Sequence, residues 1–263
     1  MKVIKINESQ KNRLFEAYQD GFSFKELSMI GNSAFSDEDN SKASYAYCVK
    51  WLGEPPFHGS SRAVFTLSDN LVLKLAYGNY FAGIEQNRVE YDLYEKIDSP
   101  LLTRILYHDE NFTYLVCENA LEARSEDFEK LLGLPFWSRY HQNSPQEPNK
   151  LVGGDYDIGF GEYFDDLKDY DEYERVYNVY NIVVYMEDAY SQDGGSYDLR
   201  MEKMINSNSW LKELRELYIK TNMTDLSQIE NFGVVNRDGN PMIVVLDSGF
   251  NYDVYLKFYR FYR

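Results

Sequence analysis

The sequence predicts an α+β fold in which a strand-rich region is followed by a mainly helical one. Between residues 57 and 120, short apolar runs separated by turn residues surround one helical segment, in the order strand, strand, helix, strand, strand. From 121 to 224, apolar residues recur at helical spacing instead. We therefore expect an N-terminal helical extension (1–56), a small lobe with an antiparallel sheet (57–120), and a helical lobe that includes a later hairpin (121–263).

The composition is that of a folded chain, since 44% of the 263 residues are hydrophobic and 27% are charged. The net charge of −16 repels phosphate backbones and argues against direct binding of nucleic acid. The start, MKVIKINESQKNRLFE, has no apolar core of a signal peptide, and no run is long enough to cross a membrane. The two cysteines and three histidines are too scattered for a zinc site. We expect a cytoplasmic protein.

The N-terminal extension is expected to hold two helices on either side of a polar loop. Asn7 and Gln10 have the spacing of a capping box. Three residues then recur at helical spacing: Leu14, Phe15 and Tyr18. The acidic run 36–42 predicts a loop, and a second helix is expected over 43–52.

Residues 57–76 predict a β-hairpin, because apolar side chains alternate up to the turn at 68–70 and a second apolar run follows it. Residues 83–97 predict a helix. Its expected inner stripe has four members: Ile84, Val89, Leu93 and Ile97. Two further strands are expected at 103–108 and 113–118, with the turn DEN between them.

The clearest helices of the later region are expected at 126–134, 171–190 and 209–219, and 143–164 is expected to be a long loop. Residues 231–247 predict a second hairpin around the turn NRDGN. The last thirteen residues, NYDVYLKFYRFYR, are expected to form a short aromatic and basic tail.

Three segments carry polar residues suited to binding phosphate and metal. The turn Gly59-Ser60-Ser61 would let backbone N–H groups approach phosphate oxygens, although an ordinary glycine-serine turn has the same residues. Lys74 lies within the apolar run VLKLA, where a buried charge needs a partner; the alternative is that it points into water. Asp247 ends the apolar strand MIVVL, and its carboxylate is a ligand type that suits Mg²⁺.

The order of these segments resembles the protein-kinase-like superfamily. The run Asp225-Leu226, Asn231-Phe232-Gly233-Val234 and Leu246-Asp247-Ser248-Gly249 resembles the catalytic loop and metal-binding turn of aminoglycoside phosphotransferases and related atypical kinases. The stretches GSSRAVF, VLKLA, GIEQNRVE, ENFGVV and VLDSGF are also similar to short uncharacterised kinase-like proteins of tailed bacteriophages. The resemblance covers residues 59–247 and implies a bilobal fold with an ATP site between the lobes.

The resemblance implies roles for individual residues. Lys74 would contact nucleotide phosphates, and a glutamate of the following helix would hold it; Glu90, sixteen residues later, is preferred to Glu85. Backbone groups near Glu118 and Ala120 would bind the adenine edge.

In the later segment, Asp225 would be the catalytic base, and Asn231 and Asp247 would bind Mg²⁺. Asp225 and Asn231 are six positions apart rather than the usual five, and the histidine or arginine expected beside the aspartate is missing. Only residues 250–263 follow Gly249, which leaves no room for an activation loop. These departures favour a kinase-like protein that lacks the chemistry over an active enzyme.

Three functions follow from this interpretation. The first is a phosphotransferase that uses ATP and Mg²⁺ and acts on a small-molecule or unusual protein hydroxyl. The second is a pseudokinase, a binding or interaction protein without the chemistry. The third is a structural or virion-associated protein.

Overall fold

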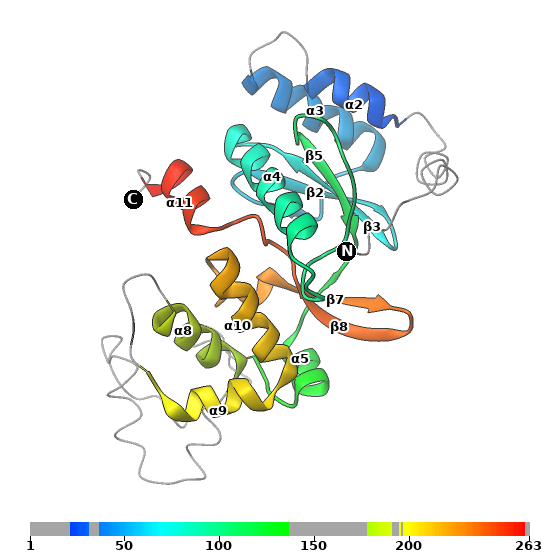
Figure 1. Cartoon of the computed structure of the whole chain (residues 1–263). Helices are drawn as coiled ribbons and strands as arrows, with labels where there is room; N and C mark the ends of the chain where they lie inside the picture. The colour runs from blue at the N-terminus through cyan, green and yellow to red at the C-terminus, as the bar shows by residue number, and fades with distance from the viewer. Residues whose placement is uncertain (1–21, 32–36, 137–177, 191–194, 196, 261–263) are drawn as a thin grey trace, which may run out of the picture. The chain divides into compact units, whose positions relative to one another are not determined.

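The computed structural model describes residues 22–31, 37–136, 178–190, 195 and 197–260, and within them it is an α+β protein. This part of the chain holds eight α-helices, a five-stranded antiparallel sheet and a three-stranded antiparallel sheet (Figure 1). The helices are α2 (Phe24–Gly31), α3 (Asp37–Leu52), α4 (Tyr80–Lys96), α5 (Ser125–Leu132), α8 (Val179–Ala189), α9 (Leu199–Ser207), α10 (Ser209–Thr221) and α11 (Tyr252–Phe258). The strands are β1 (Phe57–His58), β2 (Arg62–Ser68), β3 (Leu71–Ala76), β4 (Ile105–His108), β5 (Tyr114–Glu118), β6 (Leu121–Glu122), β7 (Phe232–Arg237) and β8 (Asn240–Val245).

Contacts divide the chain into two compact units. Unit 1 consists of residues 1–121 and 244–263, and unit 2 consists of residues 122–243. The chain passes between the units within β6 and again within β8. The lobe boundaries expected from the sequence stay predictions.

The five-stranded sheet of unit 1 has the strand order β1-β2-β3-β5-β4. The hairpin predicted at 57–76 is confirmed, since β2 and β3 pair antiparallel around a turn at Asp69 and Asn70. The two later strands are confirmed as β4 and β5, which also pair antiparallel. In the register of the β2–β3 pair, Arg62 lies opposite Ala76 and Lys74 lies opposite Val64.

The two faces of this sheet differ in chemistry. One face is apolar: Phe65, Leu73 and Leu75 pack with residues of α2 and α3 in a single buried cluster. On the other face, next to α4, the buried apolar cluster is small and consists of Val72, Ile105, Leu115 and Cys117. Because side chains alternate along a strand, Arg62 and Lys74 fall on this second face.

The helix predicted at 83–97 is α4, which begins three residues earlier. Asn79 caps it, and the Asn79 Oδ1 accepts a hydrogen bond from the Ala82 N–H at 3.4 Å. The predicted inner stripe is wrong, because its four members are only half-buried. The buried residues of α4 are instead Tyr80, Ala82, Gly83, Gln86, Asn87 and Glu90. Polar groups with internal partners therefore occupy the face that the sequence analysis assigned to aliphatic side chains.

The loop predicted at 36–42 is also wrong, since α3 already begins at Asp37. Acidic residues are favourable in the first turn of a helix, where they face the positive end of its dipole. Asn40 and Ser41 are buried although both are polar, and the Asn40 Nδ2 donates to the Gly31 C=O at 3.5 Å. The capping box of Asn7 and Gln10 and the stripe from Leu14 to Tyr18 lie outside the described residues.

Unit 2 contains α5, α8, α9 and α10 around an aromatic core. Phe128, Phe136, Trp210 and Phe232 form ring contacts with centroids 4.9–5.9 Å apart. The Trp210 Nε1 donates to the Ile243 C=O at 3.0 Å, which satisfies the polar end of the buried indole. The predicted helices at 126–134 and 209–219 are confirmed as α5 and α10, whereas the loop expected at 143–164 lies outside the described residues.

The predicted second hairpin is confirmed as β7 and β8, with a tight turn at Asp238 and Gly239. The expected tail after Asn251 is instead the short helix α11, and the Asn251 side chain caps it by accepting from the Val254 N–H at 3.0 Å. None of the helices in the described residues is long and apolar enough to cross a membrane.

Candidate functional site

Four charged side chains meet on the α4 face of the sheet in unit 1. They come from the start of β2, the middle of β3, the third turn of α4 and the segment after β8: Arg62, Lys74, Glu90 and Asp247. We call this group the charged cluster. Arg62, Lys74 and Glu90 are almost fully buried, whereas the Asp247 side chain is 34% exposed. The cluster therefore has one edge that water can reach.

The predicted ion pair between Lys74 and Glu90 is confirmed. The Lys74 Nζ donates to the Glu90 Oε1, and both side chains are buried, so the alternative that Lys74 points into water is wrong. Glu85 is not the partner, because it forms ion pairs with Arg88 at 2.7 Å and Lys257 at 3.7 Å on the surface of unit 1.

Lys74 also connects the sheet to the segment that carries Asp247. Its Nζ donates to the backbone C=O of Leu246 at 2.5 Å. The backbone of this segment is held in place just upstream, where the Val245 N–H donates to the Leu101 C=O at 2.8 Å. The strand lysine, the helix glutamate and the Asp247 segment are thus brought together within one unit.

Arg62 is the member of the cluster that the sequence analysis missed. Its Nη1 donates to the Glu90 Oε2 at 2.6 Å and to the Asn87 Oδ1 at 3.3 Å, and its Nη2 donates to the Asp247 carboxylate. Burial alone would lower the pKa of Arg62, but the charges of Asp247 and Glu90 raise it above its ordinary value. The guanidinium is therefore a permanent cation that bridges two carboxylates.

Glu90 is the shared acceptor of the cluster. Besides the two cations, the Thr103 hydroxyl lies 3.4 Å from its Oε1. Burial favours the neutral acid, yet Lys74 and Arg62 together hold the pKa of Glu90 below its ordinary value. With two cations and two carboxylates, the cluster is neutral in total.

Two close approaches of the backbone bring α4 to the cluster. A Cβ at Gly83 would lie 2.2 Å from the Ser61 C=O, and a Cβ at Gly249 would lie 2.2 Å from the Gln86 C=O. Only glycine fits at such distances.

A chain of polar contacts through Gln86 lies next to the cluster. The Ser61 hydroxyl donates to the Gln86 Oε1 at 3.1 Å, and the Gln86 Nε2 donates to the Tyr259 hydroxyl at 3.0 Å.

The predicted phosphate-binding turn joins β1 to β2. Gly59 and Ser60 are exposed, and the Gly59 N–H donates to the Arg62 C=O at 2.9 Å. Ser61 is buried, and its hydroxyl donates to Gln86 on α4 and does not face solvent. The turn thus leads directly into the charged cluster through Arg62, while phosphate binding by its N–H groups stays a prediction.

Glu118 and Ala120 lie at and just beyond the end of β5. The Glu118 N–H donates to the Arg104 C=O at 2.9 Å, and the Glu118 Oε1 accepts from the Arg104 N–H at 2.8 Å. Glu118 is therefore bound to the segment before β4. The adenine contact predicted for this region stays a prediction.

Asp225 and Asn231 belong to unit 2. Asp225 has a positive φ of 70°, which is uncommon for a residue with a side chain, and its C=O accepts from the Asn231 Nδ2 at 2.6 Å. The extra residue between them is taken up in a turn in which the Gln228 N–H also donates to the Asp225 C=O, at 3.2 Å. The metal site predicted for Asn231 and Asp247 involves both units and stays a prediction.

Glu187 on α8 is a second residue that the sequence analysis missed. Its carboxylate accepts from the Leu226 N–H at 3.1 Å and from the Ser227 N–H, so it holds the loop that follows Asp225. Burial, together with the nearby charge of Asp225, raises the pKa of Glu187 to about 7. Glu187 therefore changes its charge near neutral pH.

Asp247 has the chemistry of a Mg²⁺ ligand, but one of its oxygens is engaged by Arg62. The described residues contain no group of three or more His, Cys, Asp or Glu that could hold a metal. Mg²⁺ is commonly bound through one or two carboxylates together with ligand phosphates, and the exposed edge of Asp247 fits that arrangement.

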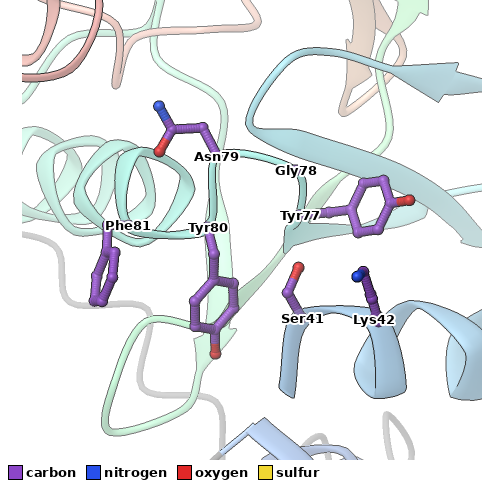
Figure 2. Close-up of a pocket in the computed structure, with 7 residues that line it drawn as sticks. All are labelled: Ser41, Lys42, Tyr77, Gly78, Asn79, Tyr80 and Phe81. Carbon is purple, nitrogen blue, oxygen red and sulfur yellow. The ribbon is translucent and has the colours of Figure 1, made fainter. Parts of the chain in front are cut away.

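A separate pocket of about 410 Å³ lies in unit 1 between α3 and the turn that joins β3 to α4. Figure 2 shows the buried Ser41 pointing from α3 toward that turn. Its lining residues are Ser41, Lys42, Tyr77, Gly78, Asn79, Tyr80 and Phe81. None of the charged cluster is among them, so the pocket and the cluster are distinct features.

The missed residues leave signals of different strength in the sequence. Arg62 shares the strand alternation of Val64, which places it on the face of Lys74. Asn87 and Gln86 precede Glu90 by three and four positions, so the three share one side of a helix. Glu187 directly follows the apolar run IVVYM, a position that predicts burial or function.

Comparison of the chain with models of protein families, with curated proteins and with solved structures found no match.

Proposed function

We propose that the chain is a kinase-like protein and that unit 1 binds the phosphates of an ATP-type nucleotide at the charged cluster, with Mg²⁺ as its companion cation. The observation that supports this most is the buried pair of Lys74 and Glu90, with Lys74 also bound to the backbone next to Asp247. In a chain with a net charge of −16, this buried cation, on the strand that pairs with the one following the glycine-serine turn, supports the binding of an anion.

In this proposal, Glu90 orients Lys74, Lys74 contacts phosphate oxygens, and Asp247 would hold Mg²⁺ against the same phosphates. The bound cation would neutralise charge on the phosphates. The bilobal kinase arrangement, with Asp225 as base for a small-molecule or unusual protein hydroxyl, is part of the same proposal.

A thermal-shift titration with Mg²⁺-ATP tests the binding. Saturation at 100 times the dissociation constant should stabilise the wild type by about 2.7 kcal/mol. Lys74→Met should weaken binding by about 10-fold or more, because it removes a charge-assisted hydrogen bond to phosphate. Lys96→Met is the matched control, since Lys96 is exposed and pairs only at the surface with Asp92. Absence of any shift in the wild type would contradict the proposal.

A pseudokinase is the second candidate function, and two contacts favour it. Asp247 is engaged by Arg62, and the Asn231 amide is engaged by the Asp225 C=O. ATP turnover by the wild type, compared with Asp225→Asn, separates the two candidates. Turnover that is lost in this variant supports the phosphotransferase, whereas nucleotide binding with no turnover supports the pseudokinase.

A further inference from the structure

Arg62 has two kinds of contact within the charged cluster. One arm of its guanidinium, Nη1, is bound to Glu90 at 2.6 Å, deep in unit 1. The other arm, Nη2, is bound to Asp247, whose side chain is 34% exposed while that of Glu90 is 1% exposed. The contact with Asp247 is therefore the one that a ligand from solution can reach.

The guanidinium can exchange one of these partners without losing the other. Its donors form a rigid fork that matches carboxylate and phosphate oxygens equally well. Glu90 and Asn87 would continue to hold Nη1 while Nη2 moves from Asp247 to a phosphate. Arg62 thus stays anchored through Nη1 to Glu90, the acceptor that it shares with Lys74.

Asp247 is affected by the same exchange. A divalent cation that arrives alone must compete with the guanidinium for the Asp247 carboxylate. A phosphate-bearing ligand offers Nη2 another anion and so releases that carboxylate. Metal and phosphate therefore favour one another's binding, and the coupling is reciprocal.

We infer that Arg62 is a phosphate-binding residue and that its ion pair with Asp247 withholds this carboxylate from divalent metal until a phosphate-bearing ligand is present. The inference rests on the proposed function, because it assumes that the charged cluster is where the phosphates bind.

The first test uses Mn²⁺ alone, followed by its paramagnetic resonance signal or by calorimetry. Arg62→Met should bind Mn²⁺ about 10-fold or more tightly than the wild type, because it loses the competing hydrogen-bonded cation. The double variant Arg62→Met/Asp247→Asn should lose this gain. Equal Mn²⁺ affinity in Arg62→Met and the wild type would overturn the inference.

The second test uses ATP in the presence of a chelator, so that no metal contributes. The wild type should bind ATP about 10-fold more tightly than Arg62→Met, because the variant lacks a charge-assisted phosphate contact. Arg62→Lys keeps a cation near Glu90 but loses the forked donors of the guanidinium. If Arg62→Met does not fold, Arg62→Lys takes its place in both tests. Equal ATP affinity in the wild type and either variant overturns the inference about Arg62 but not the proposed function. No ATP binding by the wild type, with or without metal, overturns the proposed function and the inference with it.

Discussion

Two glutamates of this protein, one in each unit, have pKa values shifted in opposite directions, although Glu90 is buried and Glu187 is half-buried. Glu90 on α4 is bound by Lys74 and Arg62, and its pKa lies below the ordinary value. Glu187 on α8 is bound by backbone N–H groups and lies near the charge of Asp225, and its pKa is raised to about 7. In the part of the chain that the structure describes, no cation forms an ion pair with Glu187.

The more buried of the two carboxylates has the lower pKa, so the partners of a desolvated carboxylate, more than its degree of burial, decide whether it carries charge. Desolvation favours the neutral acid in both residues. Two cations reverse that effect at Glu90, whereas the N–H donors at Glu187 only reduce it. Glu90 is thus a fixed anion that organises the charged cluster, and Glu187 is a group that titrates beside the loop of Asp225.

The largest expected effect comes from removing the charge of Glu90. Glu90→Gln leaves Lys74 and Arg62 buried with one carboxylate between them, and we expect a loss of about 3–5 kcal/mol in the free energy of unfolding. Urea denaturation followed by circular dichroism measures this loss.

The matched control is Glu85→Gln on the same helix. Glu85 pairs with Arg88 and Lys257 at the surface, so its replacement should cost less than about 1 kcal/mol. Similar losses in the two variants would mean that the ion pairs of Glu90 contribute no more than surface pairs, and the comparison of the two glutamates would fail.

The second prediction concerns the pH dependence of stability. The pKa of Glu187 is raised in the folded state, so its contribution to stability is fully present below the unfolded value of about 4.5 and is lost as pH rises through about 7. Over this range the wild type should lose up to about 3 kcal/mol relative to Glu187→Gln, which does not titrate. The measurement is the difference in unfolding free energy between the two proteins from pH 4.5 to pH 8.

Subtracting the unfolding free energy of Glu187→Gln from that of the wild type at each pH removes the contribution of all other titrating groups that the variant leaves unchanged. A constant difference across this range would show that Glu187 titrates as an exposed glutamate does. A difference of the opposite sign, with the wild type gaining stability as pH rises, would indicate that a cation reaches Glu187 in solution.

Much of the fold could be predicted from the sequence, because alternation and turn residues mark both hairpins. The errors have a common cause. The run 36–42 and the inner face of α4 were interpreted by polarity, yet Asn40, Asn87 and Glu90 are buried with polar partners. Hydrophobic periodicity cannot reveal a buried face built from hydrogen bonds and ion pairs.

The candidate site was predictable only in part, for a similar reason. Lys74 interrupts an apolar strand, and a buried cation requires an anion, so the pair with Glu90 could be inferred. The aliphatic stripe expected on the same helix did not mark the buried face, because its members Val89 and Leu93 are only half-buried. The pair of Arg62 and Asp247 joins residues 185 positions apart, and nothing local in either segment specifies it.

The smallest expected effect comes from the third donor to Glu90. The Thr103 hydroxyl lies 3.4 Å from the Glu90 Oε1, at the long end of hydrogen-bond distances, and Thr103 is buried. Thr103→Val keeps the shape and removes the hydroxyl, so we expect a loss of about 0.5–1.5 kcal/mol in urea denaturation. Thr66→Val is the control, since Thr66 is exposed on β2 and its replacement should change stability by less than about 0.5 kcal/mol. Because the two cations remain in Thr103→Val, the loss should stay well below that of Glu90→Gln. A loss as large as that of Glu90→Gln would mean that the hydroxyl, and not the pair of cations, keeps Glu90 charged.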